Sequence, residues 1–336
     1  MNKALALGLI FASCATAAYA DGELNLYSSR HYDTDEALYD NFEKQTGITI
    51  NRIEDGADTL IARMQSEGEL SPADLLLTVD AGRITRAADA DLLQPLKVAA
   101  ADEKVPDSLQ DGDDLWTGVT TRARIIFYDK NDVTEPPQTY LELADPKYEG
   151  MICTRSSTNV YMIALLGSII ANEGEEAAKE WAEGVVNNFA RKPQGGDTDQ
   201  LRGIISGECD IVLSNDYYYA RGFRKEVEGL TDGVDQIGYV FPNQDTTGTH
   251  INISGIGLAK HSPNPENARK FVEYLLTPEA QKMIADGNDE FPVVDGVAPS
   301  EAVQKMGDFK RDSLPLNDFA KNAAQATAIY NAAGYP

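Results

Sequence analysis

Short apolar runs alternate along the chain with longer segments whose apolar residues recur at helical spacing. Runs such as 74–79 and 210–213 are continuous and rich in branched side chains, which is typical of strands buried on both faces. Segments such as 36–46 and 175–188 place their apolar residues on one side of a helix. Because strand-like and helix-like segments follow one another through most of the chain, the pattern predicts an α/β protein.

Two extended stretches are longer than an ordinary strand. Residues 116–128 form one, and residues 237–242 with 251–258 form the other. Such stretches predict crossings between two lobes, and 336 residues are enough for two cores. We therefore expect a hinged, two-lobed fold with a central ligand cleft. The expected parts are a leader at 1–20, an N-terminal lobe at 21–118 and 243–290, and a C-terminal lobe at 119–242 and 291–336, mostly helical over 300–331.

The amino terminus has the pattern of a bacterial secretory signal. Lys3 supplies a positive charge, an apolar run follows, and residues 18–20 read Ala-Tyr-Ala, which matches an A-x-A cleavage site. The apolar run is too short to span a bilayer, and no later run is long enough. The pattern predicts export to the periplasm and a mature chain that begins near Asp21. Lipid attachment at Cys14 is the alternative for the same segment.

Acidic residues outnumber basic residues, with 54 Asp and Glu against 29 Lys and Arg. The leader holds one of those lysines, so the mature chain has 28 basic residues and a net charge of −26. This charge would repel nucleic acid and anionic membranes, and we expect neither as a partner. The sequence has no Gly-rich phosphate loop, no G-x-S-x-G motif and three histidines in all. We therefore expect a protein that is not an enzyme, and we expect it to be a monomer.

The mature chain has two cysteines, Cys153 and Cys209, and each lies at the start of a strand-like run. In an oxidising compartment two thiols favour one disulfide, and neighbouring strands would bring these two within bonding range. Two buried free thiols are the alternative. A metal site made from both is the least favoured interpretation, because thiolate prefers soft ions.

Three consecutive tyrosines, Tyr217, Tyr218 and Tyr219, follow the apolar run at 210–213. Sheets of α/β proteins place their ligands at the carboxyl ends of strands, where these phenols are expected to lie. Each buried hydroxyl needs a partner, and phenolate oxygen is a hard, anionic ligand that suits a highly charged cation such as Fe³⁺. An amphipathic patch that packs two lobes together is the alternative explanation.

Five motifs carry a resemblance to a known family. They are LYSSRHY at 26–32, WTGVTTRAR at 116–124, CTRSSTNVY at 153–161, NDYY at 215–218, and SGIGL at 254–258 followed by PENA at 265–268. In this combination the chain resembles the periplasmic ferric-iron-binding proteins of bacterial ABC importers, a transferrin-like group within the type II periplasmic binding proteins. The likeness covers essentially the whole mature chain. It is closest to the tyrosine-rich, FutA-like style of this family rather than to the style that uses an early His, a Glu and an added anion.

The resemblance implies a set of iron ligands and a partner. The ligands would be Tyr32, Tyr161, Tyr217 and Tyr218, with His31 as an optional fifth. Arg122 and Arg221 would offset the negative charge of the phenolates, and Tyr219 would pack within its lobe. The protein would close around Fe³⁺ and deliver it to an ABC permease of the inner membrane. A binding protein for an organic solute, such as a polyamine or a small anion, is the alternative.

Overall fold

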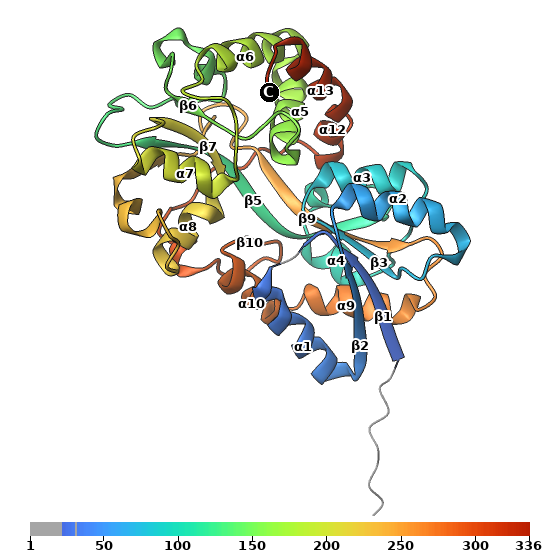
Figure 1. Ribbon diagram of the computed structural model, residues 1–336. Helices are drawn as coiled ribbons and strands as arrows, with labels where there is room; N and C mark the ends of the chain where they lie inside the picture. Colours follow the sequence, from blue (N-terminus) through green and yellow to red (C-terminus); the bar gives the residue numbers. More distant parts are fainter. Residues whose placement is uncertain (1–21, 31) are drawn as a thin grey trace, which may run out of the picture.

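The computed structural model of the protein describes residues 22–30 and 32–336 (Figure 1). The expected leader at 1–20 and the candidate ligand His31 lie outside the described residues. Strands and helices alternate through the described part of the chain, as the sequence pattern predicts. No helix in that part is both long enough and apolar enough to cross a membrane.

Ten strands of the described residues join into one mixed sheet, whose main path runs β2-β1-β3-β9-β5-β7-β6. Strand β4 pairs with β9, whereas β8 and β10 pair with β5. Parallel pairs join β1 to β2 and β3, and β6 to β7, because helices or loops carry the chain back between them. The strands are β1 Gly22–Ser28, β2 Ile48–Glu54, β3 Leu75–Thr78, β4 Leu93–Gln94, β5 Trp116–Asp129, β6 Ile152–Cys153, β7 Ile211–Asn215, β8 Ile237–Val240, β9 Ile251–Ala259 and β10 Phe291–Pro292.

Strand β5 connects the two parts of the sheet. Its residues 116–123 pair antiparallel with β9, and its residues 124–129 pair with β7 and β8. Figure 1 shows β5 running from the half of the molecule that holds β3 and β9 to the half that holds β7. The long extended run in the sequence is therefore one continuous strand, and it ends one residue later than expected. The lobe boundaries proposed from the sequence stay predictions.

Helices pack against the sheet and against one another. Helix α5 contacts α6, α12 and α13 (Figure 1), and it is apolar nearly all round because it lies at the centre of this group. The helices are α1 Glu36–Thr46, α2 Ala57–Glu67, α3 Ala81–Asp89, α4 Ala99–Lys104, α5 Val160–Glu173, α6 Glu175–Asn187, α7 Asp197–Ile205, α8 Asp216–Arg224, α9 Pro265–Leu275, α10 Pro278–Asn288, α11 Glu301–Gln304, α12 Leu316–Ala320 and α13 Ala323–Ala332.

The stretch at 300–331 is less helical than the sequence pattern predicts. Helices α11, α12 and α13 lie in it, but residues 305–315 are not helical. Gly307 has a φ of 81°, which lies outside the helical region, and Pro315 cannot continue a helix from the preceding residues. The intervening segment instead forms a parallel bridge between Arg311 and Thr249, which brings it beside the start of β9.

Cys153 and Cys209 form a disulfide in the structure, with their Cα atoms 5.7 Å apart. Cys153 lies in β6 and Cys209 lies two residues before β7, and these two strands are parallel neighbours. Both cysteines are buried. The bridge joins positions 56 residues apart, so it encloses α5, α6 and α7 in one covalent loop.

Candidate metal centre

Four of the tyrosines identified in the sequence lie together. The hydroxyl oxygen of Tyr217 is 3.4 Å from that of Tyr32 and 3.5 Å from that of Tyr161. The rings of Tyr217 and Tyr218 are neighbours, with centroids 4.2 Å apart. Because Tyr32 is 185 residues and Tyr161 is 56 residues from Tyr217, the fold rather than the local sequence brings these phenols together. We call the four residues the tyrosine cluster.

Each member of the tyrosine cluster lies near the end of a strand or the start of a helix. Tyr32 follows β1 and precedes a short 3₁₀ helix, and Tyr217 belongs to the first turn of α8, directly after β7. Tyr161 belongs to the first turn of α5, where its backbone N–H donates to the side chain of Asn159 at 3.1 Å. Helix N-termini carry partial positive charge, so these two first turns favour an anionic oxygen nearby.

Burial keeps the phenols of the cluster neutral when no cation is present. Tyr217 is 0% exposed and Tyr161 is 7% exposed. Burial raises the pKa of all four tyrosines above their ordinary value, and repulsion from Tyr161 adds to the rise for Tyr217 and Tyr218. Deprotonation at neutral pH therefore requires a strongly charged partner, and a trivalent metal ion is such a partner.

Arg221 lies over the tyrosine cluster without an acidic partner in the described residues. Its guanidinium carbon is 5.5 Å from the ring centroid of Tyr217, 5.7 Å from that of Tyr218 and 5.9 Å from that of Tyr32. Its Nε is buried and makes no hydrogen bond. The positive charge of Arg221 is therefore close to the phenol rings of the cluster, and the role that the resemblance gives this arginine stays a prediction.

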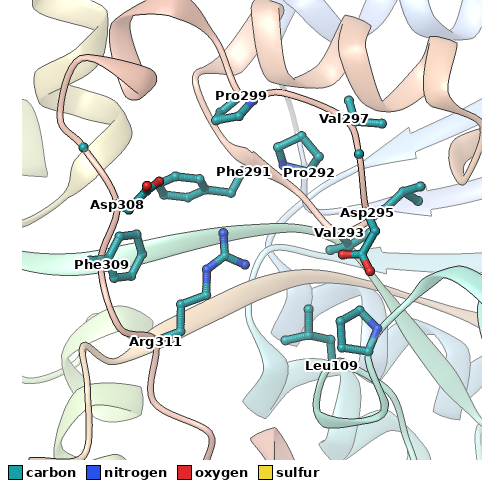
Figure 2. A pocket seen from close by; sticks show the side chains of 14 residues that line it. Leu109, Phe291, Pro292, Val293, Asp295, Val297, Pro299, Asp308, Phe309 and Arg311 are labelled. Carbon is teal, nitrogen blue, oxygen red and sulfur yellow. The ribbon is translucent and has the colours of Figure 1, made fainter. Parts of the chain in front are cut away.

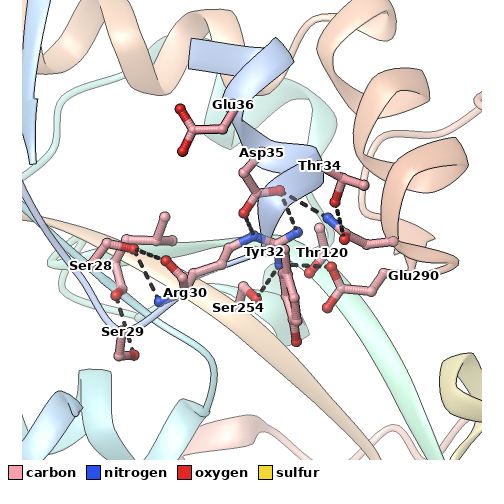
Figure 3. A network of polar contacts seen from close by, with 12 residues as sticks. Ser28, Ser29, Arg30, Tyr32, Thr34, Asp35, Glu36, Thr120, Ser254 and Glu290 are labelled. Atoms are coloured by element: carbon pink, nitrogen blue, oxygen red, sulfur yellow. Dashed lines mark hydrogen bonds and ion pairs between the residues drawn. The ribbon is translucent and has the colours of Figure 1, made fainter. Parts of the chain in front are cut away.

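Arg122 is close to the cluster, but its charge is shared with a glutamate that the sequence analysis did not single out. Arg122 and Arg30 both form ion pairs with Glu290, and the Arg30 nitrogen is 2.6 Å from the carboxylate oxygen. Both arginines also donate a hydrogen bond to the hydroxyl of Ser254. Arg30 also pairs with Asp35 at 2.7 Å (Figure 3). These four side chains are buried, and their charges sum to zero.

The buried charge cluster of Arg30, Asp35, Arg122 and Glu290 lies next to Tyr32. The guanidinium carbon of Arg30 is 4.8 Å from the ring centroid of Tyr32, and Figure 3 shows Tyr32 beside Arg30 and Glu290. Burial alone would raise the pKa of Glu290, but Arg30 and Arg122 outweigh it, and the pKa of Glu290 is lowered. This carboxylate therefore stays ionised and holds the loop that carries Tyr32 against β5 and β9.

A second buried acid supports the other side of the cluster. Asp197, the first residue of α7, pairs with Arg124 at 2.5 Å and with Arg155 at 2.7 Å. Burial would raise the pKa of Asp197, but the two arginines outweigh it and the pKa is lowered. Arg155 belongs to the motif that precedes Tyr161, so this ion pair positions the start of α5. The role of Asp197 could not be predicted from neighbouring residues, because its two arginine partners are 73 and 42 residues away in the sequence.

The tyrosine cluster is the candidate metal site, and the described residues contain no alternative metal site made of carboxylates, thiolates or imidazoles. No group of three or more His, Cys, Asp or Glu side chains in that part of the chain is arranged to hold a metal ion. Tyr219 faces another partner, since its hydroxyl donates to the backbone carbonyl of Ile237 at 3.2 Å. Among the described residues, the side-chain atoms that a metal ion at this place would meet are phenol oxygens, which suit hard and highly charged cations.

The chain belongs to the bacterial extracellular solute-binding protein family, whose model matches residues 28–282. Among individual proteins, it is similar to Iron uptake protein A1 of Synechocystis, with 45% identity over 314 residues that cover 93% of this chain and 87% of the relative. The Major ferric iron-binding protein of Neisseria meningitidis is 26% identical over 299 residues, which cover 87% of each chain. The family resemblance found in the sequence is thus confirmed.

Solved structures agree with this assignment. The Trichodesmium FutA protein, in complex with iron and citrate ligands, is 46% identical and has a TM-score of 0.89, with 94% of this chain and 100% of that chain covered. The ferric binding protein from Campylobacter jejuni is 41% identical with a TM-score of 0.89, and 93% and 100% are covered. The two-lobed type II periplasmic binding protein fold expected from the sequence is confirmed.

Proposed function

We propose that the protein captures Fe³⁺ in the periplasm and delivers it to an ABC permease of the inner membrane. The ligands are the phenolate oxygens of Tyr32, Tyr161, Tyr217 and Tyr218. The observation that carries this proposal is that the hydroxyl groups of Tyr32 and Tyr161, from two distant segments, lie 3.4 and 3.5 Å from the hydroxyl group of Tyr217. The names of the similar proteins, iron uptake and ferric iron-binding, support the same ligand.

The charges of the cluster favour a trivalent ion. Four phenolates and Fe³⁺ sum to −1, and the nearby guanidinium of Arg221 offsets that charge. A divalent ion would leave −2 and would repay less of the cost of removing protons from buried phenols. A soft ion would prefer thiolate or imidazole ligands. Hard phenolate oxygens and one unpaired arginine therefore select Fe³⁺.

Binding closes the protein and makes it a carrier rather than a catalyst. In the proposed division of the chain, Tyr32 belongs to the N-terminal lobe, whereas Tyr161, Tyr217 and Tyr218 belong to the C-terminal lobe. An ion held by both sets stabilises the closed form, which the permease distinguishes from the open form. The protein acts as an exported monomer, and it performs no reaction on the ion.

Addition of Fe³⁺ to metal-free protein should produce a red-orange absorption band from phenolate-to-iron charge transfer. Tyr217→Phe and Tyr218→Phe should each remove most of that band. Tyr219→Phe is a matched control, because Tyr219 is the next residue but donates its hydroxyl to Ile237. It should retain the colour. A colourless wild-type protein would refute the proposal, and an unchanged band in the first two variants would remove those tyrosines from the ligand set.

Titration with spermidine tests the organic-solute alternative in the same protein. The unpaired guanidinium of Arg221 lies 5.5 Å from the ring of Tyr217, and it would repel an organic cation that entered the cluster. We therefore expect no heat of binding from spermidine and no competition with Fe³⁺. Tight spermidine binding that is lost in Tyr217→Phe would favour the alternative.

A further inference from the structure

Ion pairing in the described residues leaves two arginines without an acidic partner. Twelve of the fourteen arginines have a carboxylate oxygen within 4.0 Å of a guanidinium nitrogen. The exceptions are Arg221, which lies over the tyrosine cluster, and Arg311. In a chain with 54 acidic residues, an arginine that stays unpaired is available to an anion from outside the protein. Arg311 has no part in the proposed iron site.

Arg311 reaches into a cavity of about 340 Å³ beside strand β10 (Figure 2). The cavity is formed mainly by residues 291–311, with Pro106 and Leu109 completing its wall. Figure 2 shows Asp308 and Asp295 on opposite sides of the guanidinium of Arg311. The remaining walls are largely apolar. They include Leu109, Phe291, Pro292, Val293 and Val297.

The guanidinium of Arg311 lies beside two aromatic rings, and its side chain donates no hydrogen bond within the described part of the chain. The guanidinium carbon is 5.0 Å from the ring centroid of Phe291 and 5.7 Å from that of Phe309. Phe309 in turn is stacked on Phe241 at 4.3 Å. Arg311 is exposed to solvent, so an anion in the cavity would meet a donor that two aromatic rings position at the surface of the protein.

We propose that this cavity binds a small monocarboxylate with an apolar body. The carboxylate accepts two N–H groups of Arg311 in the paired geometry that guanidinium favours, and the apolar body packs against Val293, Val297 and Leu109. The volume restricts the ligand to a small molecule. Asp295 and Asp308, together with the negative charge of the whole protein, oppose anions that carry several charges.

Calorimetric titration of metal-free protein with benzoate tests this proposal. We expect one benzoate per chain, and we expect Arg311→Gln to weaken binding about 10- to 100-fold, the loss typical of a charged hydrogen-bond partner. Benzyl alcohol and benzylamine have the same body without the carboxylate, so they should not bind. Lys305→Gln makes the same charge change at a side chain that is 71% exposed, and it should leave the affinity unchanged.

Further variants separate this site from the iron site and from loss of folding. Val297→Phe fills the cavity from a partly exposed wall position, and it should abolish benzoate binding while Arg311 remains. Tyr217→Phe should bind benzoate normally, even though it should lose the iron colour. The proposal is overturned if benzoate, 3-phenylpropionate and hexanoate all fail to bind at millimolar concentration. Equal benzoate affinity in folded wild-type and Arg311→Gln proteins would overturn it as well.

Discussion

His250 makes folding of this protein sensitive to acid. The residue lies just before β9 and is 3% exposed, with its ring 5.1 Å from the ring of Phe319. Burial lowers the pKa of His250 from 6.5 to about 3, and the positive charge of Arg124 adds to this effect. The unfolded chain therefore takes up a proton near pH 6.5, whereas the folded protein does not do so until about pH 3.

The direction and size of the effect follow from this difference in pKa. Between pH 6.5 and about 3 the unfolded state binds more protons, so the free energy of unfolding falls as the pH falls. The full loss is about 5 kcal/mol, because each pH unit between the two pKa values contributes about 1.4 kcal/mol. At pH 5 the unfolded side chain is almost entirely charged, and about 2 kcal/mol of stability should already be lost. His250→Gln cannot titrate and removes this loss.

Urea unfolding of metal-free protein at pH 7.5 and pH 5 measures the effect. The test compares the change in unfolding free energy between the two pH values in wild type and in His250→Gln. The variant also loses packing against Phe319, but that loss is the same at both pH values and cancels. Acidic side chains that titrate in the same range cancel in the same way, because both proteins contain them.

The substitution His261→Gln is the matched control, since His261 is exposed. Its pH dependence should equal that of wild type. We expect the loss of stability between pH 7.5 and 5 to be about 2 kcal/mol smaller in His250→Gln than in either other protein. A difference below about 0.5 kcal/mol would show that the His250 side chain is protonated in the folded protein, and it would refute the reasoning.

Three further predictions concern the charge cluster, the disulfide and the iron site. Glu290→Gln leaves two buried arginines without a full counter-charge and should cost about 3–5 kcal/mol in urea unfolding, whereas Glu301→Gln at an 86% exposed position should cost almost nothing. Replacing both Cys153 and Cys209 by Ser should cost about 4 kcal/mol, because the 56-residue loop is no longer closed in the unfolded chain; an unchanged urea midpoint would contradict this. Fe³⁺ should bind more weakly at pH 6 than at pH 8, because each ligating tyrosine releases about one proton on binding. Competition with a chelator measures the affinity, and equal affinities at the two pH values would count against phenolate ligands.

The parts of the site that the sequence predicted are those with a local signal. Tyr217 and Tyr218 follow a buried strand directly, so their place at the carboxyl end of β7 could be inferred from neighbouring residues. The cysteines lie next to β6 and β7, and those strands are indeed neighbours.

The parts that the sequence did not predict depend on contacts between distant positions. Glu290 meets Arg122 across 168 residues and Arg30 across 260 residues, and nothing near Glu290 in the chain marks it as buried or paired. A buried acid surrounded by turn-forming neighbours has the same local pattern as an exposed acid. The break in the helical stretch at 305–315 has a similar origin, since the bridge from Arg311 to Thr249 replaces helical hydrogen bonds there.

The contrast between Arg122 and Arg221 bears on how the proposed complex with Fe³⁺ could be buried. Both arginines were expected to offset phenolate charge, but Arg122 shares Glu290 with Arg30 in a cluster that is already neutral. Arg221 has no such partner and lies over the rings of three tyrosines in the cluster. In the proposed complex, the charges of Fe³⁺, four phenolates and Arg221 would therefore also sum to zero. Burying a net charge is costly. Two adjacent groups that are each neutral can therefore both be buried, whereas a group with an excess charge would be destabilised by burial.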